Sequence, residues 1–361
     1  MAQGFSLTNL ERSYAMIICR LSSGTRLRIY RKLQSLLRNR FSLMDALDRI
    51  HGIITNDGKN PGEPMALALM YWSRELQNGH PFSEALAGWA PARERLMLSV
   101  GDVSHMEDAL GNLIKVTEGT KRMSAPLVSA VSYPMFLMMM TVLIIYAIGV
   151  YMVPPMMNAA PNTKWTGMAR DLVGLSIWIQ EHWLFAFMIL PCVFIVIYMT
   201  LAHWKGDTRA YVESVPPWSL YRIFVGVTWL LAMAALVQAG TPVSQAMRAL
   251  RHDASPYLLR RIDRALIFIN NGDNLGEALN KTGLLFPDKE IIGDLRIYSE
   301  MDNFQGALNQ MANEWLEDSV TSIEQKAGVL NMIATLFVSG VIAWSVMGTF
   351  AMQDQITAAM G

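Results

Sequence analysis

Residues 78–86 read NGHPFSEAL, and residues 271–279 read NGDNLGEAL. The two stretches share five of nine positions: Asn78/Asn271, Gly79/Gly272, Glu84/Glu277, Ala85/Ala278 and Leu86/Leu279. The likeness extends to flanking pairs, Ala46-Leu47 with Ala246-Met247 and Ala109-Leu110 with Ala307-Leu308. The offset drifts between 193 and 200, as in two copies of one domain that have gained and lost a few residues. A repeat of this length exceeds the roughly 20–50 residues of a solenoid unit, so we predict two related domains.

Three long apolar stretches lie outside the repeated parts, at residues 135–153, 183–204 and 327–352. None contains Asp, Glu, Lys or Arg, and each is close to the roughly 20 residues that cross about 30 Å of hydrocarbon as a helix. The whole chain is 52% hydrophobic and only 17% charged, against about 25% charged in an ordinary soluble domain. We interpret these stretches as transmembrane helices rather than buried core helices.

A fourth apolar stretch, residues 223–237, is shorter. Its counterpart in the first copy, around residues 25–37, is rich in Arg and Lys. A repeated helix that is charged in one copy is a poor candidate for crossing the membrane in the other. We therefore predict that residues 223–237 form a buried helix of the second domain.

Lysine and arginine are distributed unevenly around the apolar stretches. Sixteen of the 30 precede residue 125, two lie at 154–182, twelve lie at 205–326 and none follows. Because positive charge favours the cytoplasmic side, we expect both repeated domains in the cytoplasm. The first forty residues lack the apolar core of a cleavable signal peptide, so we expect the first membrane helix to direct insertion.

These patterns predict an all-α membrane protein with two homologous cytoplasmic helical-bundle domains and three transmembrane helices. The expected boundaries are a first cytoplasmic domain at 1–124, transmembrane helix 1 at 125–153, a short periplasmic connection at 154–182, transmembrane helix 2 at 183–204, a second cytoplasmic domain at 205–326, transmembrane helix 3 at 327–352 and a periplasmic tail at 353–361.

Each domain shows helix signals in the same order, and we expect about six helices in each. Ser42 can cap a helix that begins at Leu43, with Asp45 in its first turn. The Asn-Gly pairs at residues 78 and 271 are expected to end a helix, because Gly readily adopts the left-handed conformation found there. Asn-Gly also favours a β-hairpin, but the helical patterns on both sides favour helix–turn–helix.

The sequence lacks the motifs of several function classes. It has no G-x-x-x-x-G-K-[ST] loop for nucleotide, no H-E-x-x-H and no paired C-x-x-C, and its net charge of zero gives no general surface for nucleic acid. We therefore expect no catalytic residue, no cofactor, no metal and no direct nucleic-acid binding. The acidic residues around His105, including Asp102, favour a solvated loop over a cation site. Membrane helices without charged residues argue against a transporter acting alone.

Two basic clusters are candidate partner-binding residues. The first comprises Arg26, Arg28, Arg31 and Lys32, and the second comprises Arg260, Arg261 and Arg264. Basic residues near a membrane attract anionic lipid, and they can equally dock an acidic partner. A simple solvated helix face is the third interpretation, and the sequence leaves all three open.

The ordered set of features resembles the inner-membrane platform family shared by type IV pilus assembly and type II secretion, the GspF/PilC family. The resemblance rests on the two NG-x(4)-EAL segments, the Ala-Leu pairs at 46 and 109, Tyr133-Pro134 and Pro154-Pro155, and it spans roughly residues 20–352. The chain departs from the family's G-E-x-S-G-x-L segment, with Gly101-Asp102-Val103-Ser104-His105 in one copy and Ser299-Glu300-Met301-Asp302 in the other. These departures suggest the type IVb branch, which includes the thin pili of conjugative plasmids.

The resemblance implies a non-enzymatic role in a bacterial inner membrane. A member of this family would couple a cytoplasmic hexameric assembly ATPase to pilin extraction and filament growth. Its implied partners are that ATPase, pilins, other inner-membrane assembly proteins, the lipid bilayer and further copies of the chain. The alternatives are a type II secretion platform and a small membrane transporter subunit.

Overall fold

The computed structural model describes residues 9–59, 62–100, 105–204, 208–252, 254–301 and 303–360. These residues form sixteen α-helices and one π-helical turn, and they contain no strand. The predicted all-α class is confirmed. The chain divides into two compact units, which are described separately: Met1–Ser124 with Tyr221–Val320, and Ala125–Leu220 with Thr321–Gly361.

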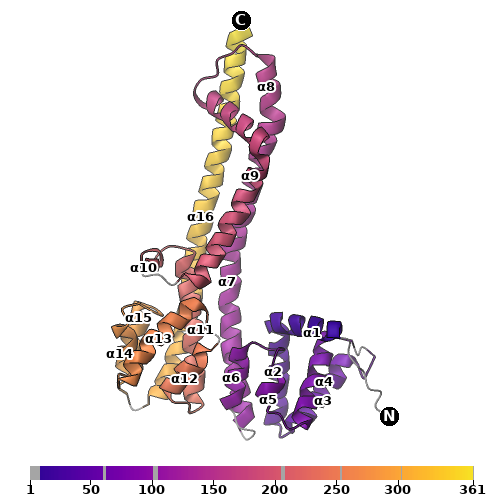
Figure 1. The fold of residues 1–361 in the computed structure, drawn as a ribbon, viewed down its shortest axis with the longest axis vertical. Coiled ribbons are helices and arrows are strands. Elements are labelled where there is room, and N and C mark those ends of the chain that lie inside the picture. Colours follow the sequence, from indigo (N-terminus) through magenta and orange to yellow (C-terminus); the bar gives the residue numbers. More distant parts are fainter. Residues whose placement is uncertain are drawn as a thin grey trace. The chain divides into compact units, whose positions relative to one another are not determined.

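The first unit contains both repeated copies, each with six helices in the same order among the described residues (Figure 1). In the first copy the helices are α2 (Ser23–Arg38), α3 (Leu43–Thr55), α4 (Pro64–Gln77), α5 (Phe82–Ala85), α6 (Ala92–Val100) and the beginning of α7 (Met106–Ala147). In the second copy they are α11 (Trp218–Gln238), α12 (Val243–Arg251), α13 (Pro256–Asn270), α14 (Leu275–Lys281), α15 (Lys289–Tyr298) and the beginning of α16 (Phe304–Met360).

One helix precedes the first copy and is not among the expected elements. Helix α1 (Asn9–Leu21) packs against α4 and α2 and lies across one end of the first-copy helices (Figure 1). Its Ala15 and Cys19 are fully buried, and the Cys19 thiol lies 3.9 Å from the Met65 sulfur. The first copy is therefore a six-helix bundle with a seventh helix across its end.

Local sequence signals explain where the helices begin and end. The Ser42 hydroxyl accepts a hydrogen bond from the Asp45 amide at 3.1 Å, as the sequence predicts for an N-cap. Helix α4 ends at Asn78-Gly79 and α13 at Asn271-Gly272, with glycine φ angles of +88° and +98°. The helix–turn–helix interpretation is thus confirmed, and the hairpin alternative is wrong.

The repeated Ala-Leu pairs after these turns belong to the core of each copy. Ala85 and Leu86 in the first copy and Ala278 and Leu279 in the second are each at most 2% exposed. Burying a leucine side chain stabilises a fold by roughly 1.5–3 kcal/mol. The shared pairs therefore reflect a common way of packing the short helices α5 and α14 onto their bundles.

Glu84 and Glu277 occupy equivalent positions in the first turns of α5 and α14, but their side chains make different contacts. In the second copy the Glu277 amide donates to Asn274 Oδ1 at 2.8 Å, and the Glu277 carboxylate accepts from Arg296 Nε at 2.9 Å. In the first copy the capping position is Pro81, which has no side-chain acceptor, and the Glu84 side chain is 67% exposed. Both glutamates lie in a first helical turn, where negative charge is favourable. Glu277 additionally ties α14 to α15, so it is a structural residue of the second copy.

Helix α11 has the length and composition of a membrane span, yet 78% of its most apolar window is buried inside the protein. The corresponding windows of α7 and α16 are only 17% buried. A helix whose surface is already buried against protein has little exposed apolar surface that could contact lipid. The prediction that this stretch forms a buried helix of the second domain is confirmed.

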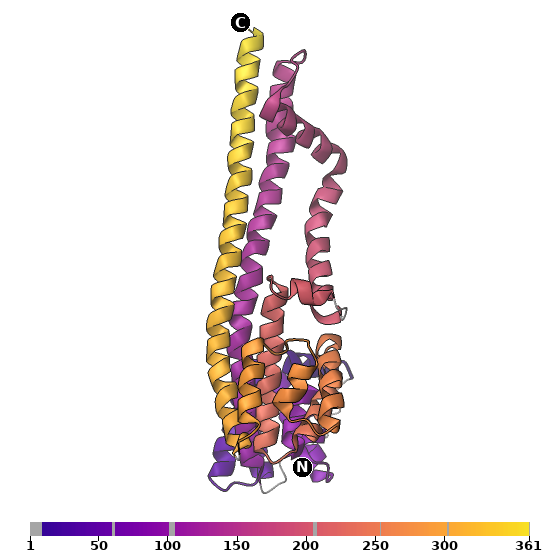
Figure 2. The same cartoon turned by 90° about the vertical axis from the view of Figure 1, so that its left-hand side faces the viewer.

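The second unit contains the remaining apolar helices. Helix α7 continues through a π-helical turn (Ile148–Met152) into α8 (Val153–Ala159), α9 (Gly167–His203) is followed by the short α10 (Arg209–Val212), and α16 runs without interruption to Met360 (Figure 2). The backbone of α9 leaves helical geometry at His182 (φ −126°). The segments Gly167–Phe185 and Phe187–His203 meet at an angle of 56°, and together they are long and apolar enough to cross a membrane. We therefore assign the three membrane spans to α7, α9 and α16.

A small apolar core joins the ends of these helices within the second unit. It contains Val153, Ala169, Leu172, Val173 and Met352, all at most 7% exposed. Two hydrogen bonds between Thr166 and Gln355 fix the segment before α9 to α16, at 3.0 and 3.2 Å. The helix ends are therefore packed together instead of being separated by a loose connection.

Candidate functional site

The first helical copy is organised around a buried ion pair. Arg26 of α2 donates from Nε to Glu94 Oε2 at 2.9 Å and from Nη2 to Oε1 at 2.8 Å. The Tyr30 hydroxyl donates to the same carboxylate at 2.8 Å. The third guanidinium nitrogen donates to the carbonyl oxygens of Cys19 and Arg20 at the end of α1. One side chain therefore holds both α6 and the last turn of α1 against α2.

Burial and charge set the protonation of this cluster. Burial alone lowers the pKa of Arg26, but the hydrogen bond and charge of Glu94 outweigh it and leave that pKa raised. Burial raises the pKa of Tyr30 well above its usual value, and the Glu94 carboxylate adds to the shift. Burial also raises the pKa of Cys19 to about 11. At neutral pH Arg26 is therefore charged while Tyr30 and Cys19 stay neutral.

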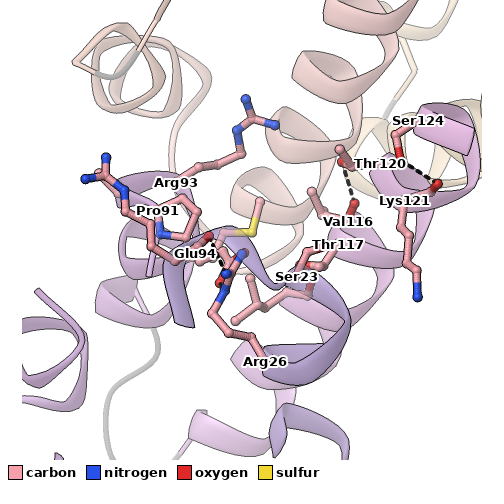
Figure 3. Close-up of a pocket in the computed structure, with 14 residues that line it drawn as sticks. Ser23, Arg26, Pro91, Arg93, Glu94, Val116, Thr117, Thr120, Lys121 and Ser124 are labelled. Carbon is pink, nitrogen blue, oxygen red and sulfur yellow. Dashed lines mark hydrogen bonds and ion pairs between the residues drawn. The ribbon is translucent and has the colours of Figure 1, made fainter. Parts of the chain in front are cut away.

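A cavity of about 490 Å³ opens beside the ion pair (Figure 3). Its lining comes from the end of α1, the start of α2, the start of α6 and residues 113–124 of α7. The charged members are Arg20, Arg26, Arg93 and Lys121, against the single carboxylate of Glu94. Four basic groups and one acidic group leave three net positive charges in a chain whose total charge is zero.

A second, more open cavity of about 790 Å³ also borders Lys121. Its charged residues are Arg28, Arg31, Lys121, Arg122 and Glu118, which again amounts to three net positive charges. Arg31 is paired with Glu118, and Arg122 is paired with Glu317 of α16. We call the solvent-facing basic residues of the two cavities the basic groove: Arg20, Arg28, Arg31, Arg93, Lys121 and Arg122.

The structure separates the predicted basic residues of the first copy. Arg26 is only 2% exposed, so its guanidinium is held inside the bundle and is not presented to a partner. Arg28, Arg31 and Lys32 are exposed on α2. The structure adds four residues that do not belong to this cluster in the sequence, namely Arg20, Arg93, Lys121 and Arg122.

The second predicted cluster is divided in the same way. Arg261 is 6% exposed, and its guanidinium carbon lies 3.5 Å from the centre of the Tyr257 ring and 5.6 Å from that of Phe286. Such a stacked cation contributes to packing inside the second copy. Arg260 and Arg264 are partly exposed on α13. Partner binding by these surface residues stays a prediction.

The two copies pack directly against each other within the first unit. A Cβ atom placed on Gly119 of α7 would lie 2.9 Å from Leu316 Cδ2 and 3.0 Å from Leu231 Cδ1. The ion pair of Arg122 with Glu317 lies three residues further along α7 and one residue further along α16, and it raises the pKa of Arg122. Helices α7 and α16, which each continue into an apolar span, therefore contact each other within the first unit.

Within the described ranges, no group of three or more His, Cys, Asp or Glu side chains is placed to hold a metal ion. The acidic residue Asp102, which the sequence analysis grouped with His105, lies outside those ranges.

Two copies with one helix order, each ending in a long apolar helix, define an internally duplicated multi-pass membrane protein. The model of the family described as type II secretion system (T2SS), protein F matches residues 29–154 and again residues 229–351, and the chain belongs to this family. The chain is also 22% identical over 344 residues to the toxin coregulated pilus biosynthesis protein E of Vibrio cholerae serotype O1. That likeness covers 94% of this chain and 99% of the relative, so it extends through both copies and all three spans.

Proposed function

We propose that this chain is the platform protein of a type IV pilus assembly machine. The family match supports a platform role in pilus assembly or secretion in the inner membrane. The observation that carries the pilus role is the likeness to a pilus biosynthesis protein along 94% of this chain and 99% of the relative. A type II secretion platform is the second candidate, because the family to which the chain belongs is described as protein F of that system.

In this proposal both helical copies face the cytoplasm, and the C-terminus lies on the periplasmic side. The distribution of Lys and Arg supports this orientation, since 28 of the 30 lie before residue 125 or at 205–326. A cytoplasmic hexameric assembly ATPase docks on the helical copies, and α7 and α16 contact pilins. The chain functions with other inner-membrane assembly proteins and as a homo-oligomer.

The packing of the first unit suggests how force would pass from the ATPase to the membrane. Gly119 and the pair of Arg122 with Glu317 join α7 to α16, so a push on either copy acts on both helices. Each helix then continues without a loop into its apolar segment. A continuous helix transmits displacement better than a flexible linker does, which favours direct coupling between docking and pilin movement.

A detergent pull-down of the full chain from its native host tests the proposal. We expect an assembly ATPase and a prepilin among the bound proteins. Recovery of a pseudopilin with a secretion ATPase would assign the chain to type II secretion instead. Recovery of neither class from folded protein would contradict both platform roles.

Docking of the ATPase is tested by charge reversal at the surface arginines of the second basic cluster. These arginines would dock an acidic surface of the ATPase. We therefore expect Arg260→Glu with Arg264→Glu to weaken ATPase recovery, because the new carboxylates would repel that surface. Arg261 stays unchanged, since its burial makes it a residue of the core. The control reverses Arg49 and Arg74, which are exposed on α3 and α4 of the first copy. Equal recovery with both double variants would rule out docking at α13.

A further inference from the structure

Helix α1 exposes an apolar stripe to solvent. Tyr14, Ile17 and Leu21 are 63%, 59% and 79% exposed. Their spacing of three and four residues places them on one face of the helix. The opposite face of α1 packs against the bundle, where Ala15 and Cys19 are fully buried. The exposed stripe is therefore an additional apolar surface and not the side that attaches α1 to its domain.

The cavity beside α1 shows which end of the bundle carries this stripe. Arg20, in the last turn of α1, lines the same cavity as Lys121 and Ser124 of α7. The charge-free part of α7 begins immediately after Arg122, and the first large exposed apolar side chain after Lys121 is Val128. Seven residues of helix rise only about 10 Å. The end of α1 thus lies at the end of the bundle from which α7 enters the bilayer.

The charges around α1 complement an anionic surface. The basic groove brings Arg20, Arg93 and Lys121 together from three different helices. The other three members of the groove, Arg28, Arg31 and Arg122, line its second cavity, in which Glu118 is the single carboxylate. An apolar helical stripe bordered by basic residues is the pattern of a helix that lies in the membrane interface.

We propose that α1 and the basic groove form a membrane-surface face. The stripe of Tyr14, Ile17 and Leu21 lies among the acyl chains at the lipid boundary, and the groove holds the phosphate of an anionic phospholipid. Lipid is favoured over a protein occupant because α7 tethers this end of the bundle to the bilayer. This inference does not depend on the pilus role, since it concerns only how the first copy is held to the membrane.

Depth-dependent fluorescence quenching tests the stripe in the full chain. Ile17→Cys carries the fluorophore in a Cys192→Ala background, and lipid nanodiscs contain quencher-bearing phospholipids. The control is Ile297→Cys on α15, where the side chain is also exposed, at 61%. Residue 297 lies seven residues before α16 begins, far along the chain from the apolar span of that helix. We expect strong quenching at position 17 and little at position 297. Equal, weak quenching at both positions would overturn the interfacial placement.

The number of copies per nanodisc distinguishes lipid from a second chain. Equal quenching at position 17 in discs that hold one copy and in discs that hold two copies supports the proposal. Protection of position 17 from the quencher only in discs that hold two copies would show that the stripe is an interface between chains, and would overturn it.

Native mass spectrometry of the full chain tests the groove. Lys121→Gln is compared with Lys115→Gln, an exposed lysine six residues earlier on the same helix that lines a different cavity. We expect Lys121→Gln to weaken binding of phosphatidylglycerol relative to phosphatidylcholine by about fivefold, and Lys115→Gln to leave it unchanged. Equal effects of the two variants would overturn the site. Displacement of the lipid by millimolar inorganic phosphate would assign the groove to free phosphate and overturn the lipid assignment.

Discussion

Arg26 and Glu94, 68 residues apart in the chain, form a two-pronged ion pair inside the first copy at 2.9 and 2.8 Å. The second copy has a glycine at the corresponding position. Helices α2 and α11 end at Arg38 and Gln238, and the same offset of 200 aligns Arg26 with Gly226. A Cβ on Gly226 would lie 2.6 Å from Pro287 Cβ. Helix α2 is thus held to its neighbour by a buried ion pair, whereas its counterpart α11 is held by a close apolar contact.

Removing the carboxylate from this buried ion pair is expected to be costly. Glu94→Gln leaves the Arg26 guanidinium charged and buried without a counter-ion, which destabilises a fold by about 3–5 kcal/mol. Thermal unfolding of the full chain in detergent measures the loss. The matched control is Glu118→Gln, whose partner Arg31 has a side chain that is 56% exposed. Exposed pairs contribute about 0–1 kcal/mol, so similar losses in both variants would contradict the structural role of the buried ion pair.

The sequence predicts the parts of the fold that depend on local signals. Ser42, Gly79 and Gly272 act within one turn of their own position, so the starts and ends of their helices follow from the sequence. Comparison between the copies also identifies α11 as buried despite its composition. The same reasoning works less well for side chains on a helix that is basic on several faces. Arg26 and Arg28 lie two residues apart on α2, and only the packing of α6 and α1 decides that the first is buried.

The basic groove could not be predicted for a related reason. Lys121 and Arg122 carry a sequence signal, because they are the last charges before a long apolar run. Arg93 carries none, since it reaches the groove only through the position of α6 in the bundle. Residues that are distant in the chain and lack a shared motif become a site only when the tertiary fold brings them together.

A glycine in the second copy permits an unusually close helix contact. A Cβ on Gly276 of α14 would lie 2.3 Å from the backbone nitrogen of Arg296 and 2.5 Å from its Cα. Gly276→Ala is therefore expected to force α14 and α15 apart and to destabilise the fold by about 1–3 kcal/mol, the usual cost of overpacking. Gly293→Ala on α15 is the control, because nothing lies within 4 Å of its added Cβ. Alanine there is expected to stabilise the helix by up to about 1 kcal/mol. Stabilisation by both substitutions in a thermal unfolding assay would contradict the close contact.

The buried thiol of Cys19 is expected to react slowly and with a shifted pH dependence. Burial raises the pKa of this thiol from 9.0 to about 11, so the thiolate fraction at pH 8 falls by about a hundredfold. In a Cys192→Ser protein, maleimide labelling should stay slow at pH 8 and increase as the pH approaches 11. The same protein unfolded in detergent should label with an ordinary thiol profile. An apparent pKa near 9 in the folded chain would contradict the buried environment.

The same shift has a consequence for stability. The folded chain holds the Cys19 proton more tightly than the unfolded chain does, so this contribution to the free energy of unfolding is fully present below about pH 9. It is lost as the pH rises through about 11. The raised pKa of Tyr30 acts in the same direction at alkaline pH. Thermal unfolding between pH 8 and 11 should therefore show a falling midpoint, and a constant midpoint would contradict the linkage.

The π-helical turn is expected to depend on side-chain hydrogen bonds from α9. Ser176 of α9 is fully buried and donates to the carbonyl oxygen of Gly149 at 2.5 Å. The Val153 amide donates to Ile148, and residue 154 is a proline without an amide hydrogen, so the Gly149 carbonyl has no regular helical donor. Ser176→Ala therefore removes the shorter of two side-chain hydrogen bonds to this carbonyl and leaves that of Gln180 Nε2 at 3.4 Å. A hydrogen bond of this kind contributes about 1 kcal/mol, which corresponds to a roughly fivefold faster amide exchange around residues 148–157.

Ser345 provides the matched control for this last prediction. It is 2% exposed, but its hydroxyl donates to Val341 in its own helix at 2.8 Å. That carbonyl already accepts the regular helical hydrogen bond, so Ser345→Ala should leave exchange unchanged. Hydrogen exchange with mass spectrometry on the full chain separates the two variants. Faster exchange at 148–157 in Ser176→Ala alone supports the contact between α9 and the turn, whereas equal exchange in both variants would show that the turn is held by its apolar packing.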